Sequence, residues 1–250
     1  MYLCLSFKLN FKLNKYILTM KKLFATICLV LTLGLFSTQT FAQQGKFKGI
    51  VKYALIWEGE VPPGAPTSLD IKVFENQTAF DDMFSGSKVL TNAKLGTSYA
   101  LFDFSQVPVE GVTGKWYIKD KMDPKELENN TYDVTSETKE IAGKTTKKVN
   151  VTMKSEDGAV KNETIWMCEE MGPEQDLRFY PGLKGMPFEF PVDLDKFQVT
   201  FKVSEIIEGG KVEKADMLLP TGYEEVTVEE FQEIIAILME AIGGGQGDDI

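Results

Sequence analysis

The chain has 250 residues, a formal net charge of −10 and no histidine. The absence of histidine excludes Ser-His and Cys-His nucleophile pairs, and zinc sites that use a histidine ligand. An acidic surface repels the phosphates of nucleic acids and of anionic lipid headgroups, so we expect neither as a partner.

The N-terminal region is typical of a secretory signal peptide. Residues 20–42 contain Met-Lys-Lys, then an apolar run over residues 23–36, then a short stretch that ends at Ala42. The apolar run is too short to span a bilayer as a stable helix, and Thr40 and Ala42 are small enough for a cleavage site. We therefore expect a periplasmic or secreted protein that is cleaved near Ala42, without a transmembrane segment in the mature chain, which would start at Gln43.

The remainder of the chain predicts one domain. Residues 1–19 are expected to be an over-extended N-terminus, with an unusually long signal n-region as the alternative. Without residues 1–42, which hold five lysines and no acid, 22 basic and 37 acidic side chains remain, a net charge of −15. Cys168 is then the single cysteine, which excludes an internal disulfide, and we interpret it as a small buried hydrophobe. We expect one domain over residues 43–242 that depends on its own core, and a disordered glycine-rich tail over residues 243–250.

Apolar and polar residues alternate along most of the domain, which is the pattern of half-buried β-strands. The strands that we predict cover residues 50–57, 69–73, 88–91, 98–104, 115–119, 132–139, 147–154, 162–167, 198–207 and 212–219. Glycine-containing turns at residues 155–158 and 208–211 favour antiparallel neighbours. The expected fold is mainly β (α+β): a large antiparallel sheet of about ten strands.

One amphipathic helix is predicted at the C-terminal end of the domain. Thr227 and Glu230 form a capping box, and an apolar stripe follows at helical spacing. The stripe consists of Phe231, Ile234, Ile235, Leu238, Met239 and Ile242. Because the sheet is the one large apolar surface available, we expect the helix to cover it as a lid that contributes up to about 10 kcal/mol. A short helical turn is also predicted after Asp123.

Carboxylates are the remaining candidates for chemistry. Neighbouring acids could act as acid and base or hold calcium, at Glu58 and Glu60, Asp81 and Asp82, Glu169 and Glu170, and Asp193 and Asp195. No calcium-loop motif organises them, so we interpret them as solvated acidic turns, and Gly182 and Gly185 as turn glycines. We predict no catalytic residue, no metal ligand and no cofactor, and we do not expect an enzyme.

Three segments carry a resemblance to a known family. Residues 137–148, Ile165-Trp166 and Gly182-Leu-Lys-Gly-Met-Pro-Phe-Glu-Phe190 are similar to the core of uncharacterised bacterial envelope proteins of the GLPGLI type, although Lys184 stands at the central proline. The Pro-x-Gly-Tyr run of residues 220–231 resembles a related domain-of-unknown-function family with the fold of LolA-like lipoprotein carriers. The resemblance implies an incomplete barrel with helices packed over its concave face, and it transfers no catalytic residue.

Three functions are compatible with these observations. The first is a periplasmic carrier or sensor that binds a lipid-like apolar ligand between sheet and helix. Its expected wall consists of Tyr53, Leu55, Trp57, Ile71, Val73, Trp116, Trp166, Ile235 and Leu238. The second is an envelope scaffold or protein-interaction module with a filled core, and a carboxylate-dependent hydrolase is a distant third. An apolar cavity above about 300 Å³ would favour the carrier, and a solid core would favour the scaffold.

Overall fold

The computed structural model describes residues 47–59, 61, 63–82, 86–155, 158–171, 176, 179–194 and 197–243. The chain divides into two units, residues 1–42 and 43–250. The predicted N-terminal extension and signal peptide lie outside the described residues, as do residues 244–250 of the predicted tail, Glu60 and Asp195. Cleavage near Ala42 stays a prediction.

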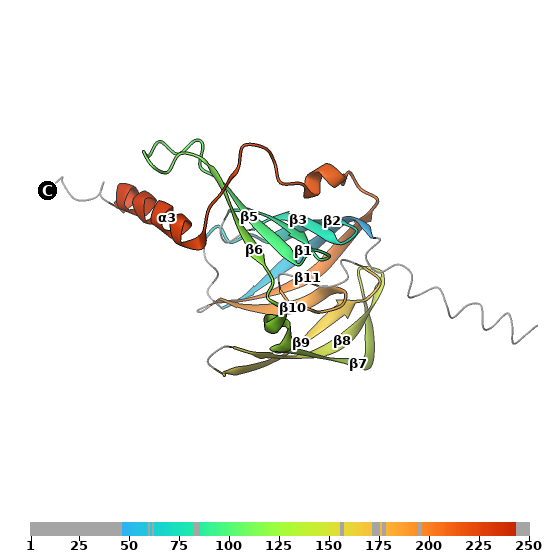
Figure 1. The fold of residues 1–250 in the computed structure, drawn as a ribbon. Helices are drawn as coiled ribbons and strands as arrows, with labels where there is room; N and C mark the ends of the chain where they lie inside the picture. Colours follow the sequence, from blue (N-terminus) through green and yellow to red (C-terminus); the bar gives the residue numbers. More distant parts are fainter. Residues whose placement is uncertain are drawn as a thin grey trace, which may run out of the picture. The chain divides into compact units, whose positions relative to one another are not determined.

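Twelve strands form a single sheet within the described part of the chain (Figure 1). The strands are β1 (Lys48–Glu58), β2 (Ser68–Phe74), β3 (Gln77–Asp81), β4 (Lys88–Asn92), β5 (Thr97–Asp103), β6 (Lys115–Lys121), β7 (Asn130–Ile141), β8 (Lys144–Lys154), β9 (Val160–Cys168), β10 (Met186–Leu194), β11 (Phe197–Glu208) and β12 (Glu224–Glu225). The helical elements are α2 (Pro124–Glu128), the 3₁₀ turn η1 (Lys214–Met217) and α3 (Val228–Gly243).

The strand order is β12-β6-β5-β4-β3-β2-β1-β11-β10-β9-β8-β7. Neighbouring strands are antiparallel except for the parallel pair β12 and β6. Most pairs are consecutive in sequence, whereas β1 pairs with β11 and so joins the two halves of the sheet. The predicted fold class, a large curved antiparallel sheet that does not close, with one C-terminal helix, is confirmed.

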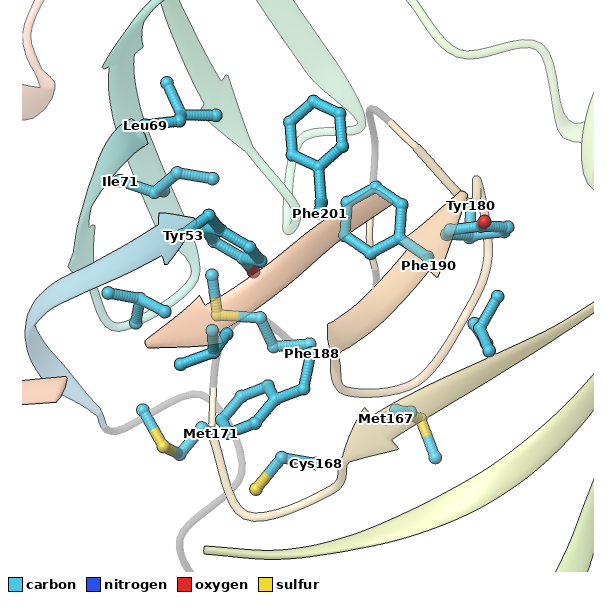
Figure 2. Close-up of a cluster of buried hydrophobic side chains, with 14 of the residues drawn as sticks. Tyr53, Leu69, Ile71, Met167, Cys168, Met171, Tyr180, Phe188, Phe190 and Phe201 are labelled. Carbon is cyan, nitrogen blue, oxygen red and sulfur yellow. The ribbon is translucent and has the colours of Figure 1, made fainter. Parts of the chain in front are cut away.

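The main core explains the curvature of the sheet. Buried side chains from β1 to β4 and from β7 to β11 pack in one cluster, so the sheet bends around them. Figure 2 shows Tyr53 of β1, Ile71 of β2, Phe190 of β10 and Phe201 of β11 directed toward one another. The alternating burial along β1 and β2 follows the predicted pattern, with Tyr53 and Ile71 on the buried face.

A second, smaller cluster lies on the opposite face of β3, β4 and β5. Ala79, Leu90 and Leu101 are buried there beneath Val212 and Met217, which belong to the segment that follows β11. The faces are opposite because the neighbouring residues Phe80 and Val89 belong to the main core.

Three strands were not predicted, and one predicted strand is wrong. Residues 212–219 form η1 and an irregular segment, because the carboxylate of Asp216 accepts a hydrogen bond from the Glu213 backbone at 2.7 Å and closes a turn. Strands β3 and β12 are short, and β10 contains Pro187 and Pro191, which normally argue against a central strand. The pairing of β10 with β9 shifts register beside Pro187, so a bulge accommodates the missing N–H.

The C-terminal helix begins as predicted but lies elsewhere. The Thr227 hydroxyl accepts a hydrogen bond from the Glu230 backbone at 3.1 Å, and the Glu230 carboxylate accepts one from the Thr227 backbone at 2.8 Å. The Phe231 ring lies 4.1 Å from the ring of Phe102 on β5, and none of the side chains described in α3 is fully buried. Figure 1 shows α3 beside β5 and β6 and far from β8 and β9. The expected position over the concave core is therefore wrong, because other residues occupy that space.

Within the described residues, no helix combines the length and apolarity needed to cross a membrane.

Candidate functional site

Four residues of the expected ligand wall lie in the main core. Tyr53, Leu55, Ile71 and Val73 are buried, and all four pack within the same cluster. The ring of Tyr53 makes edge contacts with Phe190 at 6.1 Å and with Phe201 at 6.3 Å. Its hydroxyl donates a hydrogen bond of 2.8 Å to the carbonyl of Pro187. These four side chains therefore pack against other side chains of the main core.

Side chains from the connection between β9 and β10 fill the concave face of the sheet. Phe179 lies 4.8 Å from Phe190 and 5.4 Å from Phe201, measured between ring centroids, and Tyr180 meets Phe190 edge-on at 5.5 Å. Leu183 of the same loop is also buried in the cluster. Figure 2 shows Tyr180 pointing at Phe190 from the side opposite Tyr53.

Asp176 holds this loop in place. Its carboxylate accepts hydrogen bonds from the backbone N–H groups of Phe179 at 2.7 Å and Tyr180 at 2.5 Å. Its own N–H donates to the carbonyl of Leu183 at 2.8 Å. Gly185 follows with a φ of +123°, and a Cβ there would lie 2.7 Å from the carbonyl oxygen of Cys168. The loop therefore requires glycine at that position, which agrees with the interpretation of Gly182 and Gly185 as turn glycines.

The other five residues of the expected wall are not brought together. Trp57 and Trp166 are half-buried and pack against the main core; the Trp57 indole donates to the Pro66 carbonyl at 2.8 Å. The Lys139 ammonium lies over the Trp166 ring at 4.2 Å. The remaining three, Trp116, Ile235 and Leu238, are half-buried and belong to β6 and α3, outside both buried clusters.

Burial keeps the ionisable groups of the core in their neutral forms. It raises the pKa of the Tyr53 phenol, and it is also the main reason why the pKa values of Tyr132 and Tyr180 are raised. Tyr132 donates its hydroxyl to the Pro181 carbonyl at 2.8 Å. Burial likewise raises the pKa of the Cys168 thiol, whose side chain is fully enclosed. Cys168 is thus the buried hydrophobe that we predicted, and the phenols of Tyr53 and Tyr132 act as hydrogen-bond donors.

Two of the carboxylates that we singled out, Glu169 and Asp193, form ion pairs at the surface. Asp193 meets Lys161 at 2.7 Å and accepts a hydrogen bond from the Gln198 amide at 2.6 Å. Glu169 meets Lys147 at 2.7 Å. Among the described residues, no group of three or more His, Cys, Asp or Glu side chains is placed to hold a metal ion.

We describe two hollows that are lined by described residues. The larger, of about 350 Å³, lies where β1 starts and β11 ends; Phe47 and Met171 line it together with Lys48, Lys144, Glu170 and Glu208. The Lys144 ammonium and the Glu208 carboxylate form an ion pair of 2.6 Å at this hollow. Its size meets the criterion for a carrier, but its lining is largely charged.

The smaller hollow, of about 190 Å³, lies on the outer face of β4 and β5. We call it the β4–β5 groove. Its lining is Gln77, Leu90, Thr91, Asn92, Leu95, Thr97, Tyr99, Met217, Leu218 and Leu219. The sequence pattern does not reveal this groove, because it predicts a strand over residues 212–219. The signal that could have revealed it is Leu218-Leu219-Pro220, an apolar pair placed before a strand-breaking proline.

Comparisons with known proteins give a likeness of fold. No family model and no curated sequence matches the chain. A structure of PNGF-II in a C2 crystal form superposes with a TM-score of 0.50 at 11% identity, covering 76% of this chain and 33% of PNGF-II. A P21 form of PNGF-II gives a TM-score of 0.46 at 11% identity over the same shares of the two chains. A Vibrio parahaemolyticus domain named for outer membrane lipoprotein sorting gives 0.22 at 8% identity, over 70% of this chain and 91% of that one.

The chain thus spans about a third of the length of PNGF-II, and at 11% identity the likeness concerns the fold alone. The similarity to the GLPGLI type stays a resemblance.

Proposed function

We propose that this chain is an exported, non-catalytic interaction module of the bacterial cell envelope, with a filled core and a binding surface on its outside. The observation that carries the proposal is the packing of Phe179, Tyr180 and Leu183 into the concave face of the sheet. These side chains occupy the space where a carrier would hold its ligand.

An apolar ligand would have to displace residues that are already well packed. Phe190 and Phe201 stack at 4.9 Å with their planes 11° apart, and Phe179 and Tyr180 close the stack. Exposing any one of these rings to water costs about 1.5–3 kcal/mol. The Asp176 hydrogen bonds to the loop would also have to break. A filled core is therefore the arrangement that this packing favours.

The absence of catalysis is part of the proposal. The phenols of the core keep their protons, because burial raises their pKa values, and they already donate to backbone carbonyls at Pro187 and Pro181. Asp193 and Glu169 form ion pairs on the surface. We propose no cofactor and no metal.

Export to the periplasm or the cell exterior is supported by the signal-peptide pattern of residues 20–42. N-terminal sequencing of the protein recovered from the envelope is expected to start at Gln43. A sequence that begins before Leu23 would contradict export by cleavage.

Native mass spectrometry of the protein purified from its own envelope, followed by organic extraction, tests the filled core. We expect the native mass to equal that of the polypeptide and the extract to contain no stoichiometric lipid. Co-purification of one lipid per chain would refute the proposal.

The hollow of about 350 Å³ favours a second candidate, a carrier of an apolar ligand with a charged headgroup. Phe47 and Met171 offer apolar contacts there, and Lys144 offers a cation. If a fatty-acid analogue raises the melting temperature saturably, and Lys144→Glu abolishes that response, the carrier replaces the scaffold.

A further inference from the structure

The β4–β5 groove has the size and lining of a pocket for one side chain. Leu90 and Met217 are buried at its floor, and Tyr99 packs beside them. Pockets for small molecules usually measure about 300–1,000 Å³, whereas this groove measures about 190 Å³. A volume of this size suits a single bulky side chain, the kind of anchor that dominates protein interfaces.

Three leucines at the groove are exposed to solvent. Leu95 is 63% exposed, Leu218 is 54% exposed and Leu219 is 37% exposed. Leu95 belongs to the turn between β4 and β5, and the other two belong to the segment after η1. Segments far apart in sequence thus bring three exposed leucines to one hollow, and exposed apolar side chains that gather at one place are a common feature of interaction sites.

A buried polar atom also lies at the groove. The Thr97 side chain is 6% exposed, and its hydroxyl has no hydrogen-bond partner among the described residues. An unsatisfied buried hydroxyl costs about 1–3 kcal/mol.

Three lysines lie near the groove, two on β6 and one in the turn between β4 and β5. Lys121 lies opposite Thr97 and Lys119 lies opposite Tyr99 in the pairing of β5 with β6, so both share the face of the groove. Lys94 precedes Leu95 in the turn. All three are exposed, and none forms an ion pair with a described residue. This is an unpaired positive patch on a chain whose expected mature charge is −15.

We propose that the β4–β5 groove binds a segment of a partner protein that inserts one bulky apolar side chain between Leu95 and Leu218 and carries acidic residues beside it. The lysines select the acidic flanks, and the leucines enclose the anchor. The proposal deepens the interaction function and rests on it. A membrane surface is the other occupant that leucines and lysines could attract, but the net negative charge of the chain opposes binding to anionic lipids.

Selection from a phage-displayed library of random short peptides tests this proposal. The full-length protein is the target, and the Leu218→Ser variant is used for counter-selection. We expect enriched peptides to share one Phe, Leu, Ile or Trp with Asp or Glu nearby. A synthetic copy of the enriched peptide then serves as the probe in fluorescence anisotropy.

Variants with matched controls give the expected sizes of effect. Leu218→Ser and Leu95→Ser are expected to weaken the peptide by about tenfold, because each removes apolar contact area. Lys121→Glu is expected to weaken it severalfold at low salt and hardly at all at high salt. Val160→Ser and Lys154→Glu, exposed positions on the β8–β9 hairpin with 55% exposure at Val160, are expected to bind like the wild type.

Several outcomes would overturn the proposal. The selection could enrich no peptide whose binding depends on Leu218, or it could enrich a basic motif. The enriched peptide could also bind the Leu218→Ser variant as tightly as the wild type. Flotation with phosphatidylethanolamine–phosphatidylglycerol vesicles that depends on Leu95 and Leu218 would instead assign the groove to a membrane. None of these results changes the native mass of the protein, so this proposal and the filled core fail separately.

Discussion

Replacing Phe190 by alanine tests the filled core directly. The ring is 1% exposed, stacks on Phe201 at 4.9 Å and lies 4.8 Å from Phe179. Truncating a buried phenylalanine to alanine costs about 3–5 kcal/mol, and each aromatic pair adds about 0.5–1.5 kcal/mol beyond area burial. Because Phe190 meets Tyr53 and Tyr180 as well, we expect a loss of unfolding free energy at the upper end, about 4–5 kcal/mol.

A urea titration measures this loss of unfolding free energy. Benzene binding then shows whether a cavity is created by the substitution or is already present in the wild type. The variant is expected to have a dry apolar void that takes up benzene, so its melting temperature should rise with benzene concentration. The wild type, whose concave face is occupied, should show no such rise. Phe102→Ala serves as the control: this half-buried ring should cost about 1–2 kcal/mol and create no benzene response.

A loss below about 1 kcal/mol for Phe190→Ala would show that the ring borders an existing void. The same conclusion would follow if benzene stabilised the wild type and the variant equally. Either result would refute the filled core and favour a carrier.

Three further predictions concern the surface and the pH dependence. Ile235→Asp is expected to cost only about 1 kcal/mol in a denaturant titration, and Glu233→Lys on the opposite face close to zero, because Ile235 is only half-buried and water can still reach a charge there. Thr97→Val is expected to raise the unfolding free energy by about 1 kcal/mol, because it removes an unsatisfied buried hydroxyl; a loss of stability would reveal a hidden partner. Burial disfavours the charged form of Glu189, but its two lysine partners outweigh burial and lower its pKa from 4.5. The stabilisation by Glu189 is therefore complete above its unfolded-state pKa and is lost as the pH falls through the lower folded-state pKa, so Glu189→Gln should flatten the acid limb of a stability–pH curve.

Alternation was a sound guide to the strands because a sheet with one buried face imposes a period of two on the side chains. It identified Val51, Tyr53 and Leu55 as one face of β1 and the same pattern in β2. It did not find β10, since two prolines hide that strand from any rule based on hydrogen-bonding potential. The bulge beside Pro187 is a tertiary accommodation that the local sequence does not encode.

Hydrophobic patterning identifies a face that will be buried, but it does not identify what covers it. The stripe on α3 required an apolar surface, and two such surfaces existed: the concave face of the sheet and the aromatic edge at Phe102 and Phe104. The loop that carries Phe179 and Tyr180 is nearer in sequence to β9 and β10 and is fixed by the Asp176 hydrogen bonds, so it occupies the concave face. Helix α3 therefore packs on the aromatic edge instead, where Phe231 contacts Phe102 and Phe104.

If the protein is the interaction module that we propose, it binds its partners through its outer faces, and these faces differ. On the outer face of β7 to β11, Lys139 and Lys202 pair with Glu189 at 2.7 and 3.1 Å, so these two lysines already have a carboxylate partner. On the outer face of β4 to β6, Lys115 pairs with Asp103 at 2.8 Å, but Lys119 and Lys121 form no ion pair with a described residue and lie on the face that carries the exposed leucines. A binding surface requires groups whose interactions improve on contact, because groups that are already paired must be desolvated without gain. Recognition is therefore expected on the side of the β4–β5 groove.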